Sequence, residues 1–251
     1  MIQMHSYFLR KYFTEDDTWN RIQYFFEYGY YIPEMKKIYA SIAKNGSMSL
    51  QRVKRFYEKK DDIQLINPTH EAWSDSENEV IFFLRHPLER FRSAMQFEYE
   101  QFEKNPLKKP RPYFLYFEQR VGVCLESNSN HHYLPQSVYL LYDEKDLSLF
   151  KDGDESPMII GRGYSWARNN GGYNEILKKV SPCTDSRIKY YHLSQITDII
   201  SRTSDKSKMI NLNQSNPNPE VDKWIEANMD RIASVYSEDI NIYERLTGRK
   251  D

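Results

Sequence analysis

Two short segments carry side chains that can hold phosphate-like anions. The first follows the apolar run 38–43 and consists of Lys44, Asn45, Gly46, Ser47, Met48 and Ser49. The second begins with Arg85 after the apolar run 80–84, and Ser93 follows eight residues later. Backbone N–H groups at a helix start, a lysine and hydroxyl groups together bind oxyanions. The two segments predict a site for a ligand that carries phosphate-like groups at both ends.

Both segments lie where the hydrophobic pattern predicts a strand that turns into a helix. Expected strands cover 37–43, 63–66, 79–85, 138–142 and 188–192, and expected helices cover 16–28, 47–59, 113–126, a stretch from Pro87, a stretch near 194–203 and the chain after 219. This alternation predicts an α/β fold with a mostly parallel central sheet flanked by helices. Because ligands bind at the carboxyl ends of parallel strands, we expect Lys44 and Arg85 at one sheet edge.

Composition narrows the class of protein. The chain has 251 residues and a net charge of −1, which predicts a single domain over 1–251 and gives no reason to expect a nucleic-acid partner. Cys124 and Cys183 are its only cysteines and have no metal-ligand spacing, so no metal is expected. Without a signal-peptide pattern or a long apolar run, the sequence predicts a soluble, cytoplasmic protein.

Three residues are candidates for a general base. His70 and Glu71 follow the expected strand 63–66 and would lie at the same edge as Lys44. His132 lies in a polar segment further along the chain. Imidazole suits proton transfer near neutrality because its ordinary pKa is about 6.5. A solvated loop is the alternative interpretation of each, so the identity of the base stays open; the pair 131–132 lacks the third ligand that a metal site needs.

The two anion-binding segments resemble the donor-binding elements of sulfotransferases that use 3′-phosphoadenosine 5′-phosphosulfate, most closely the Golgi-type carbohydrate sulfotransferases. Segment 44–49 is similar to their 5′-phosphosulfate loop, although Ala43 stands where the family usually has proline. Arg85 and Ser93 are similar to their 3′-phosphate element. The resemblance implies a P-loop-like three-layer fold, the phosphosulfate as co-substrate, adenosine 3′,5′-bisphosphate as product, and Lys44 beside the leaving phosphate.

Three later segments extend the resemblance. Residues 131–136 are similar to a His-Trp-x-Pro-Gln segment of these enzymes, with Tyr133 in place of Trp, which implies that His132 binds the acceptor or moves a proton. Related enzymes place a His or Glu base in the region of His70 and Glu71, which makes His70 the first candidate for the base and His132 its rival.

The other two segments lie near the C-terminus. Asn213 and Ser215 match an Asn-x-Ser segment found near the donor nucleotide in the family. Residues 236–243 are similar to a Tyr-x-x-Asp ending, which is a structural feature of these enzymes.

These residues predict a sulfotransferase whose acceptor is a hydroxyl of a carbohydrate or of another small compound. One alternative is a non-catalytic module of the same fold that binds a nucleotide or a glycan. Another is a P-loop small-molecule kinase, against which the sequence counts because no glycine precedes Lys44 at the required spacing. Residues 1–36, an N-terminal extension, and 143–187, an irregular insertion, lie outside this resemblance and are expected to carry acceptor specificity.

Overall fold

The structure is a computed structural model. It describes residues 5–6, 29–40, 42, 44–46, 50, 72, 75–104, 132–133, 135–142, 173–179, 181–183, 185–201 and 217–250.

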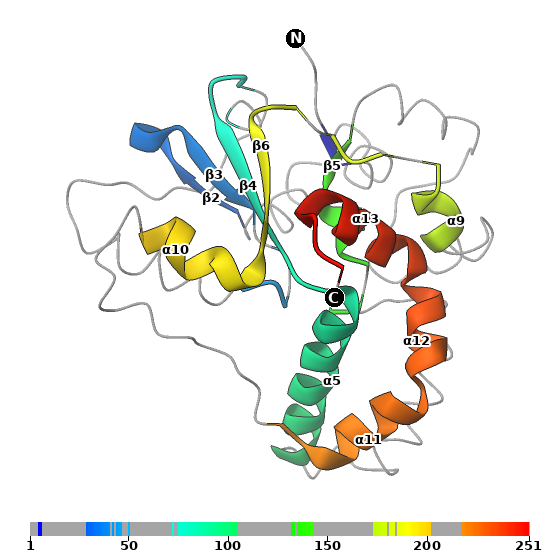
Figure 1. Ribbon diagram of the computed structural model, residues 1–251. Coiled ribbons are helices and arrows are strands. Elements are labelled where there is room, and N and C mark those ends of the chain that lie inside the picture. Colours follow the sequence, from blue (N-terminus) through cyan, green and yellow to red (C-terminus); the bar gives the residue numbers. More distant parts are fainter. Residues whose placement is uncertain are drawn as a thin grey trace, which may run out of the picture.

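A four-stranded sheet with the order β2-β3-β4-β6 lies at the centre of the molecule (Figure 1). Its strands are β2 (Tyr30–Ile32), β3 (Lys37–Ala40), β4 (Glu79–Leu84) and β6 (Ile188–His192). Strands β3, β4 and β6 are parallel, and β2 runs antiparallel to β3. The register pairs Leu84 with His192, so the chain leaves β4 and β6 side by side.

Strand β4 is buried because helices cover both faces of the sheet. Its sequence, Glu-Val-Ile-Phe-Phe-Leu, is apolar after the first residue, as expected for a central parallel strand. Val80, Phe82 and Leu84 pack in one core with Tyr243 of α13 (Ser237–Thr247). The alternating residues Ile81 and Phe83 pack in a second core that includes two residues of α10 (Ile196–Ser201). The predicted α/β fold with a mostly parallel sheet is therefore confirmed.

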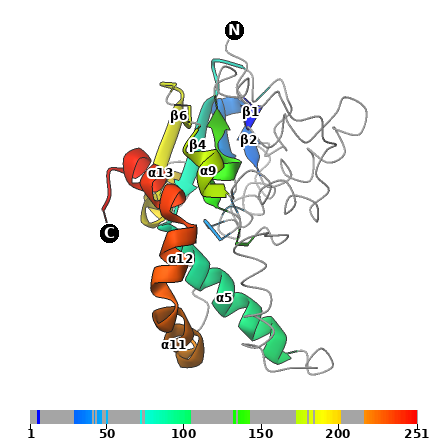
Figure 2. The same cartoon turned by 90° about the vertical axis from the view of Figure 1, so that its right-hand side faces the viewer.

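A group of helices extends away from the sheet (Figure 2). It consists of α5 (Pro87–Lys104), α11 (Pro219–Ala227) and α12 (Met229–Val235). The helix predicted from Pro87 is confirmed, and its residues Phe91 and Met95 are buried in a third core with Val221 and Ile225 of α11. The Asn218 side chain accepts the N–H of Glu220 at 2.9 Å and so caps α11.

Short elements complete the described chain. They are β1 (His5–Ser6), which pairs with β5 (Leu141–Tyr142), the 3-10 turns η1 (Pro33–Met35), η3 (Gln136–Tyr139) and η4 (Leu193–Gln195), and α9 (Tyr173–Leu177). Among the described helices, none is both long enough and apolar enough to cross a membrane.

Several predicted elements agree with the structure and others need correction. The strand over 188–192 is confirmed, and the strand over 79–85 ends one residue early. The strand over 37–43 ends at Ala40, and the carbonyl of Ile42 already accepts the turn bond from the N–H of Asn45.

Other corrections concern short or interrupted elements. Residues 1–36 contain two strands, β1 and β2, that were not predicted. The strand predicted over 138–142 is confirmed only at Leu141 and Tyr142, since residues 138–139 end the 3-10 turn η3. The helical C-terminus is divided at Asn228 and Tyr236. The helices over 16–28 and 113–126, the strand over 63–66 and nearly all of the helix over 47–59 lie outside the described residues.

A buried carboxylate attaches the last helix to the turn before β5. Asp239 of α13 is 1% exposed, and its two oxygens accept the N–H of Gln136 at 3.1 Å and the N–H of Ser137 at 2.8 Å. The Ser137 hydroxyl donates to the same carboxylate. One helical turn earlier, the Tyr236 hydroxyl donates to the carbonyl of Tyr133. The Tyr-x-x-Asp ending thus fixes the segment that carries His132 and Gln136.

We expect Asp239→Ala to reduce the free energy of unfolding by about 3–5 kcal/mol, because it leaves two buried amides and a hydroxyl without an acceptor. Urea unfolding followed by circular dichroism measures this loss. Asp230→Ala, on the exposed side of α12, is the matched control and should change stability by no more than about 0.5 kcal/mol. Equal stabilities of the two variants would contradict the structural role of Asp239.

Candidate functional site

The sequence-predicted cations lie at the carboxyl edge of the sheet. Lys44 follows β3, and Arg85 follows the neighbouring parallel strand β4 directly. His192 ends β6 on the other side of β4. The sheet therefore brings three basic side chains to one edge, two of which the sequence predicted.

The loop after β3 turns through two left-handed residues. Lys44 has φ 67° and Gly46 has φ 79°. The carbonyl of Gly46 accepts the N–H of Leu50 at 3.0 Å, which is the spacing of an α-helical bond. Leu50, the next described residue after the turn, is helical, which agrees with the helix predicted to follow the loop. Position 46 is also closely packed: a Cβ there would lie 2.7 Å from Cδ1 of Ile196 and 2.8 Å from Cδ1 of Leu193, so the ends of these side chains would have to shift.

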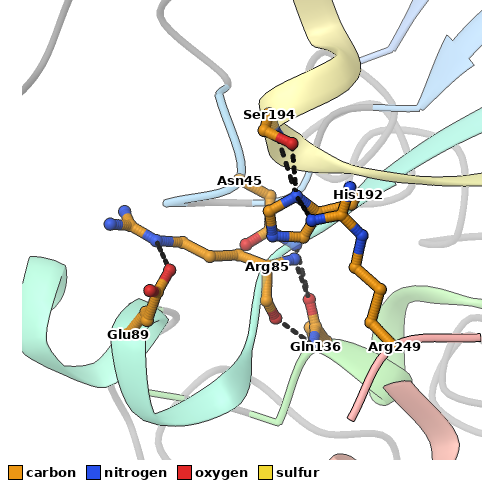
Figure 3. A network of polar contacts seen from close by, with 7 residues as sticks. All are labelled: Asn45, Arg85, Glu89, Gln136, His192, Ser194 and Arg249. Carbon is orange, nitrogen blue, oxygen red and sulfur yellow. Dashed lines mark hydrogen bonds and ion pairs between the residues drawn. The ribbon is translucent and has the colours of Figure 1, made fainter. Parts of the chain in front are cut away.

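Gln136 holds this loop against the end of β4 (Figure 3). Its Nε2 donates to the carbonyl of Arg85 at 2.7 Å, and its Oε1 accepts the N–H of Arg85 at 3.1 Å. The same Oε1 accepts Nδ2 of Asn45 at 2.7 Å. Asn45 and Gln136 are each 1% exposed, so these bonds are shielded from water. Asn45, predicted to contact the donor, has its amide nitrogen directed to Gln136 and fixes the loop.

One face of α5 connects the two cations. Glu89, Ser93 and Phe97 are spaced by four residues and share that face. At its beginning, Arg85 Nε lies 3.5 Å from Oε2 of Glu89. Two turns further along, Lys44 Nζ lies 3.5 Å from the centre of the Phe97 ring. Ser93, half-buried, lies between these contacts, so the structure aligns the predicted 3′-phosphate pair with the predicted lysine.

His132 adjoins the same aromatic ring. Its imidazole meets the Phe97 ring nearly at right angles, with ring centres 5.5 Å apart. Nδ1 of His132 lies 3.5 Å from Oε1 of Glu98, the next residue of α5. The predicted base His132 and the predicted leaving-group cation Lys44 therefore contact one side chain.

The surroundings of Lys44 disfavour its charge. Burial lowers the pKa of Lys44 to about 8; Glu98 opposes that change, whereas Arg90 and Arg85 add to it. Burial also lowers the pKa of Arg85, with Glu89 acting in the opposite direction. Partly desolvated cations with too little nearby negative charge gain stability when an anion binds. The edge of the sheet is thus suited electrostatically to an anionic ligand.

Arg249, a basic residue that sequence reasoning missed, lies beside His192 at the end of β6. Arg249 Nη1 lies 2.9 Å from Nδ1 of His192, and the N–H of Ser194 donates to the same nitrogen at 3.2 Å (Figure 3). Guanidinium and amide nitrogens only donate, so Nδ1 of His192 accepts and its proton resides on Nε2. No sequence signal marked Arg249, Phe97 or Glu98, whereas Gln136 lay in a segment already singled out.

Several predicted site residues lie outside the described residues: Ser47, Met48, Ser49, His70, Glu71, Asn213 and Ser215. Within the described part of the chain, no three His, Cys, Asp or Glu side chains come together as metal ligands would.

Comparison with protein-family models found no matching family. Searches of curated proteins and of solved structures likewise found no match. Functional inference for this chain therefore depends on the geometry of its own residues.

We expect Gly46→Ala to destabilise the protein more than Gly248→Ala. Both glycines have positive φ, at 79° and 68°, so both variants carry a left-handed alanine, which costs about 1–2 kcal/mol. Only the Cβ at position 46 meets other side chains, since nothing lies within 4 Å of a Cβ at position 248. Thermal unfolding of the two variants measures the difference, and equal losses would contradict the packing described around Gly46.

Proposed function

We propose that this protein is a sulfotransferase that moves a sulfuryl group from 3′-phosphoadenosine 5′-phosphosulfate to an acceptor hydroxyl, with a P-loop-like three-layer fold. The observation that carries the proposal is the shared face of α5. Arg85 pairs with Glu89 at one end of this face, Ser93 lies one turn further along, and Lys44 and His132 contact Phe97 one turn beyond that.

Two cations that contact different turns of α5 suit a donor with anionic groups at both ends. Arg85, with Ser93, is assigned to the 3′-phosphate, since a guanidinium binds phosphate through two parallel hydrogen bonds. Arg85 can leave Glu89 to bind the phosphate, or can contact both groups. The Glu89 side chain is 57% exposed, so its ion pair with Arg85 is weak. Lys44 is assigned to the 5′-phosphosulfate, at the other end of the same helix face.

Sulfuryl transfer requires mainly that the reactants are positioned and that the charge on the leaving group is stabilised. By analogy with phosphoryl transfer, the acceptor oxygen attacks sulfur, the bond from sulfur to the bridging phosphate oxygen breaks, and negative charge develops on the leaving phosphate. Lys44 neutralises that charge. His132 takes the acceptor proton, and we prefer it to His70 and Glu71 because it adjoins the ring that Lys44 contacts.

A carbohydrate or another small hydroxyl compound is the proposed acceptor. Phe97, beside His132, is 36% exposed and is the only large apolar side chain counted as exposed among the described residues. An exposed aromatic ring next to a base provides a flat apolar surface for the less polar face of a sugar ring.

We expect adenosine 3′,5′-bisphosphate to raise the thermal midpoint of the wild-type protein. At about 100 times its dissociation constant the ligand should add about 2.7 kcal/mol, or roughly 5–10 °C. Arg85→Ala should abolish the shift, because it removes the 3′-phosphate contact. Arg92→Ala, which removes a more exposed arginine of α5 paired with Asp222, should retain it.

ATP with magnesium, titrated in parallel, separates the alternatives. A shift with ATP but none with the bisphosphate would favour a P-loop kinase and overturn the proposal. Bisphosphate binding without transfer of labelled sulfate to glycan or phenol acceptors would favour the non-catalytic nucleotide-binding module.

Bisphosphate affinity should fall as pH rises, because the anion binds the protonated form of Lys44, whose pKa is about 8. The protonated fraction is high below that value and low above it, so affinity should drop about tenfold between pH 7 and pH 9. The phosphate groups do not confuse the measurement, since their second ionisation is complete above about pH 7.

Isothermal titration calorimetry across this range measures the dependence. Lys44→Met should bind more weakly at pH 7 and show a nearly flat profile. A wild-type profile as flat as that of the variant would remove Lys44 from the binding site.

A further inference from the structure

Glu98 lies between the two ends of the proposed reaction. It follows Phe97 on α5, and its Oε1 is 3.5 Å from Nδ1 of His132. Its negative charge also raises the pKa of Lys44 and so opposes the effect of burial. One carboxylate therefore interacts electrostatically with both the proposed base and the proposed leaving-group cation.

The pair formed by Glu98 and His132 is partly shielded from solvent. The side chains of His132 and Glu98 are 19% and 27% exposed, in contrast to the more exposed ion pairs on α5. Shielding strengthens the attraction of the pair relative to a surface salt bridge. The Phe97 ring, which meets the imidazole at 88°, limits rotation of His132.

The chemistry of this pair selects one tautomer of His132. An ionised carboxylate only accepts hydrogen bonds, so the nitrogen that faces it carries the proton. Nδ1 is then protonated and Nε2 bears the lone pair. At 3.5 Å the two atoms are at ion-pair distance and do not form a hydrogen bond in the structure, and we expect the contact to tighten into one when substrate binds, as catalytic contacts commonly do.

We propose that Glu98 is a positioning residue that holds His132 in its Nδ1–H tautomer, so that Nε2 accepts the proton of the acceptor hydroxyl. The proposal rests on the sulfotransferase function proposed above. During transfer, the acceptor oxygen forms a bond to sulfur as the bond to the bridging phosphate oxygen breaks. The acceptor proton moves to Nε2, and Glu98 stabilises the resulting imidazolium while Lys44 stabilises the leaving phosphate.

Charged groups around this centre come from several elements. Glu98 and Arg90 belong to α5, Arg85 follows β4, Lys44 follows β3, and His132 precedes η3. Arg90 and Arg85 are positively charged, as Lys44 is, and therefore lower its pKa. Glu98 is the negative group that raises this pKa. Removing Glu98 should therefore shift the alkaline loss of bisphosphate affinity to lower pH.

The first test detects the tautomer without any ligand. Long-range ¹H–¹⁵N spectra of protein with labelled histidines, recorded at about pH 8 where an ordinary imidazole is neutral, report which ring nitrogen is protonated. His132→Asn assigns the signal. We expect Nδ1–H in the wild type and a shift toward Nε2–H in Glu98→Ala, with Glu100→Ala unchanged because Glu100 pairs with Lys104 instead. An Nε2–H tautomer in the wild type would overturn the proposal.

The second test follows sulfate transfer. Glu98→Ala should lower kcat by about 10- to 100-fold with little change in the KM for the donor near pH 7. Glu98→Gln, which keeps an acceptor but no charge, should lie between Glu98→Ala and the wild type, and Glu98→Asp should recover part of the rate. Equal kcat values for Glu98→Ala and Glu100→Ala would refute the positioning role while leaving the sulfotransferase function intact.

The two tests fail in different ways. A tautomer change in Glu98→Ala, in a protein that binds no bisphosphate and transfers no sulfate, would confirm the pairing of Glu98 with His132 and overturn the reaction assigned to it.

Discussion

The carboxylate of Asp239 is the contact on which the rest of the site depends. It is buried, and burial raises its pKa, while the bonds from Ser137 and Gln136 act in the opposite direction. By accepting the N–H groups of Gln136 and Ser137 it fixes the turn η3. The side chain of Gln136 in turn binds the backbone of Arg85 and the amide of Asn45. A chain of buried and partly buried hydrogen bonds thus connects the last helix to both anion-binding segments.

Helix α5 sets the distance between the two ends of the site. Because residues four apart lie on one face, Glu89 and Phe97 are separated by two helical turns, or about 12 Å. Arg85 contacts the first of these residues and Lys44 the second. The core shared by α5 and α11 holds the helix itself, so the positions of both contact residues depend on packing remote from the cations.

The sequence predicts those strands and helices that a local pattern of residues determines. The buried parallel strand β4 is a short apolar run, so it could be predicted. Strand β2 could not, because three residues carry too little pattern and it forms by pairing with β3. The turn η3 could not either, since it depends on Asp239, which lies 102 residues from Ser137 in the chain.

The same distinction separates the predicted site residues from those that were missed. Lys44, Arg85 and His132 were found because each stands in a recognisable segment. Glu98 stands among several acidic residues of α5, and only the three-dimensional structure distinguishes it from Glu100, which pairs with Lys104.

The role of Glu98 follows from the charges around Lys44. Two arginines and partial burial lower the pKa of Lys44, and Glu98 raises it. A site built this way gives up some stability in the free protein, because Lys44 is charged where its charge is poorly solvated. An anionic ligand relieves that disadvantage, so the feature that weakens the fold locally is the one that favours the ligand.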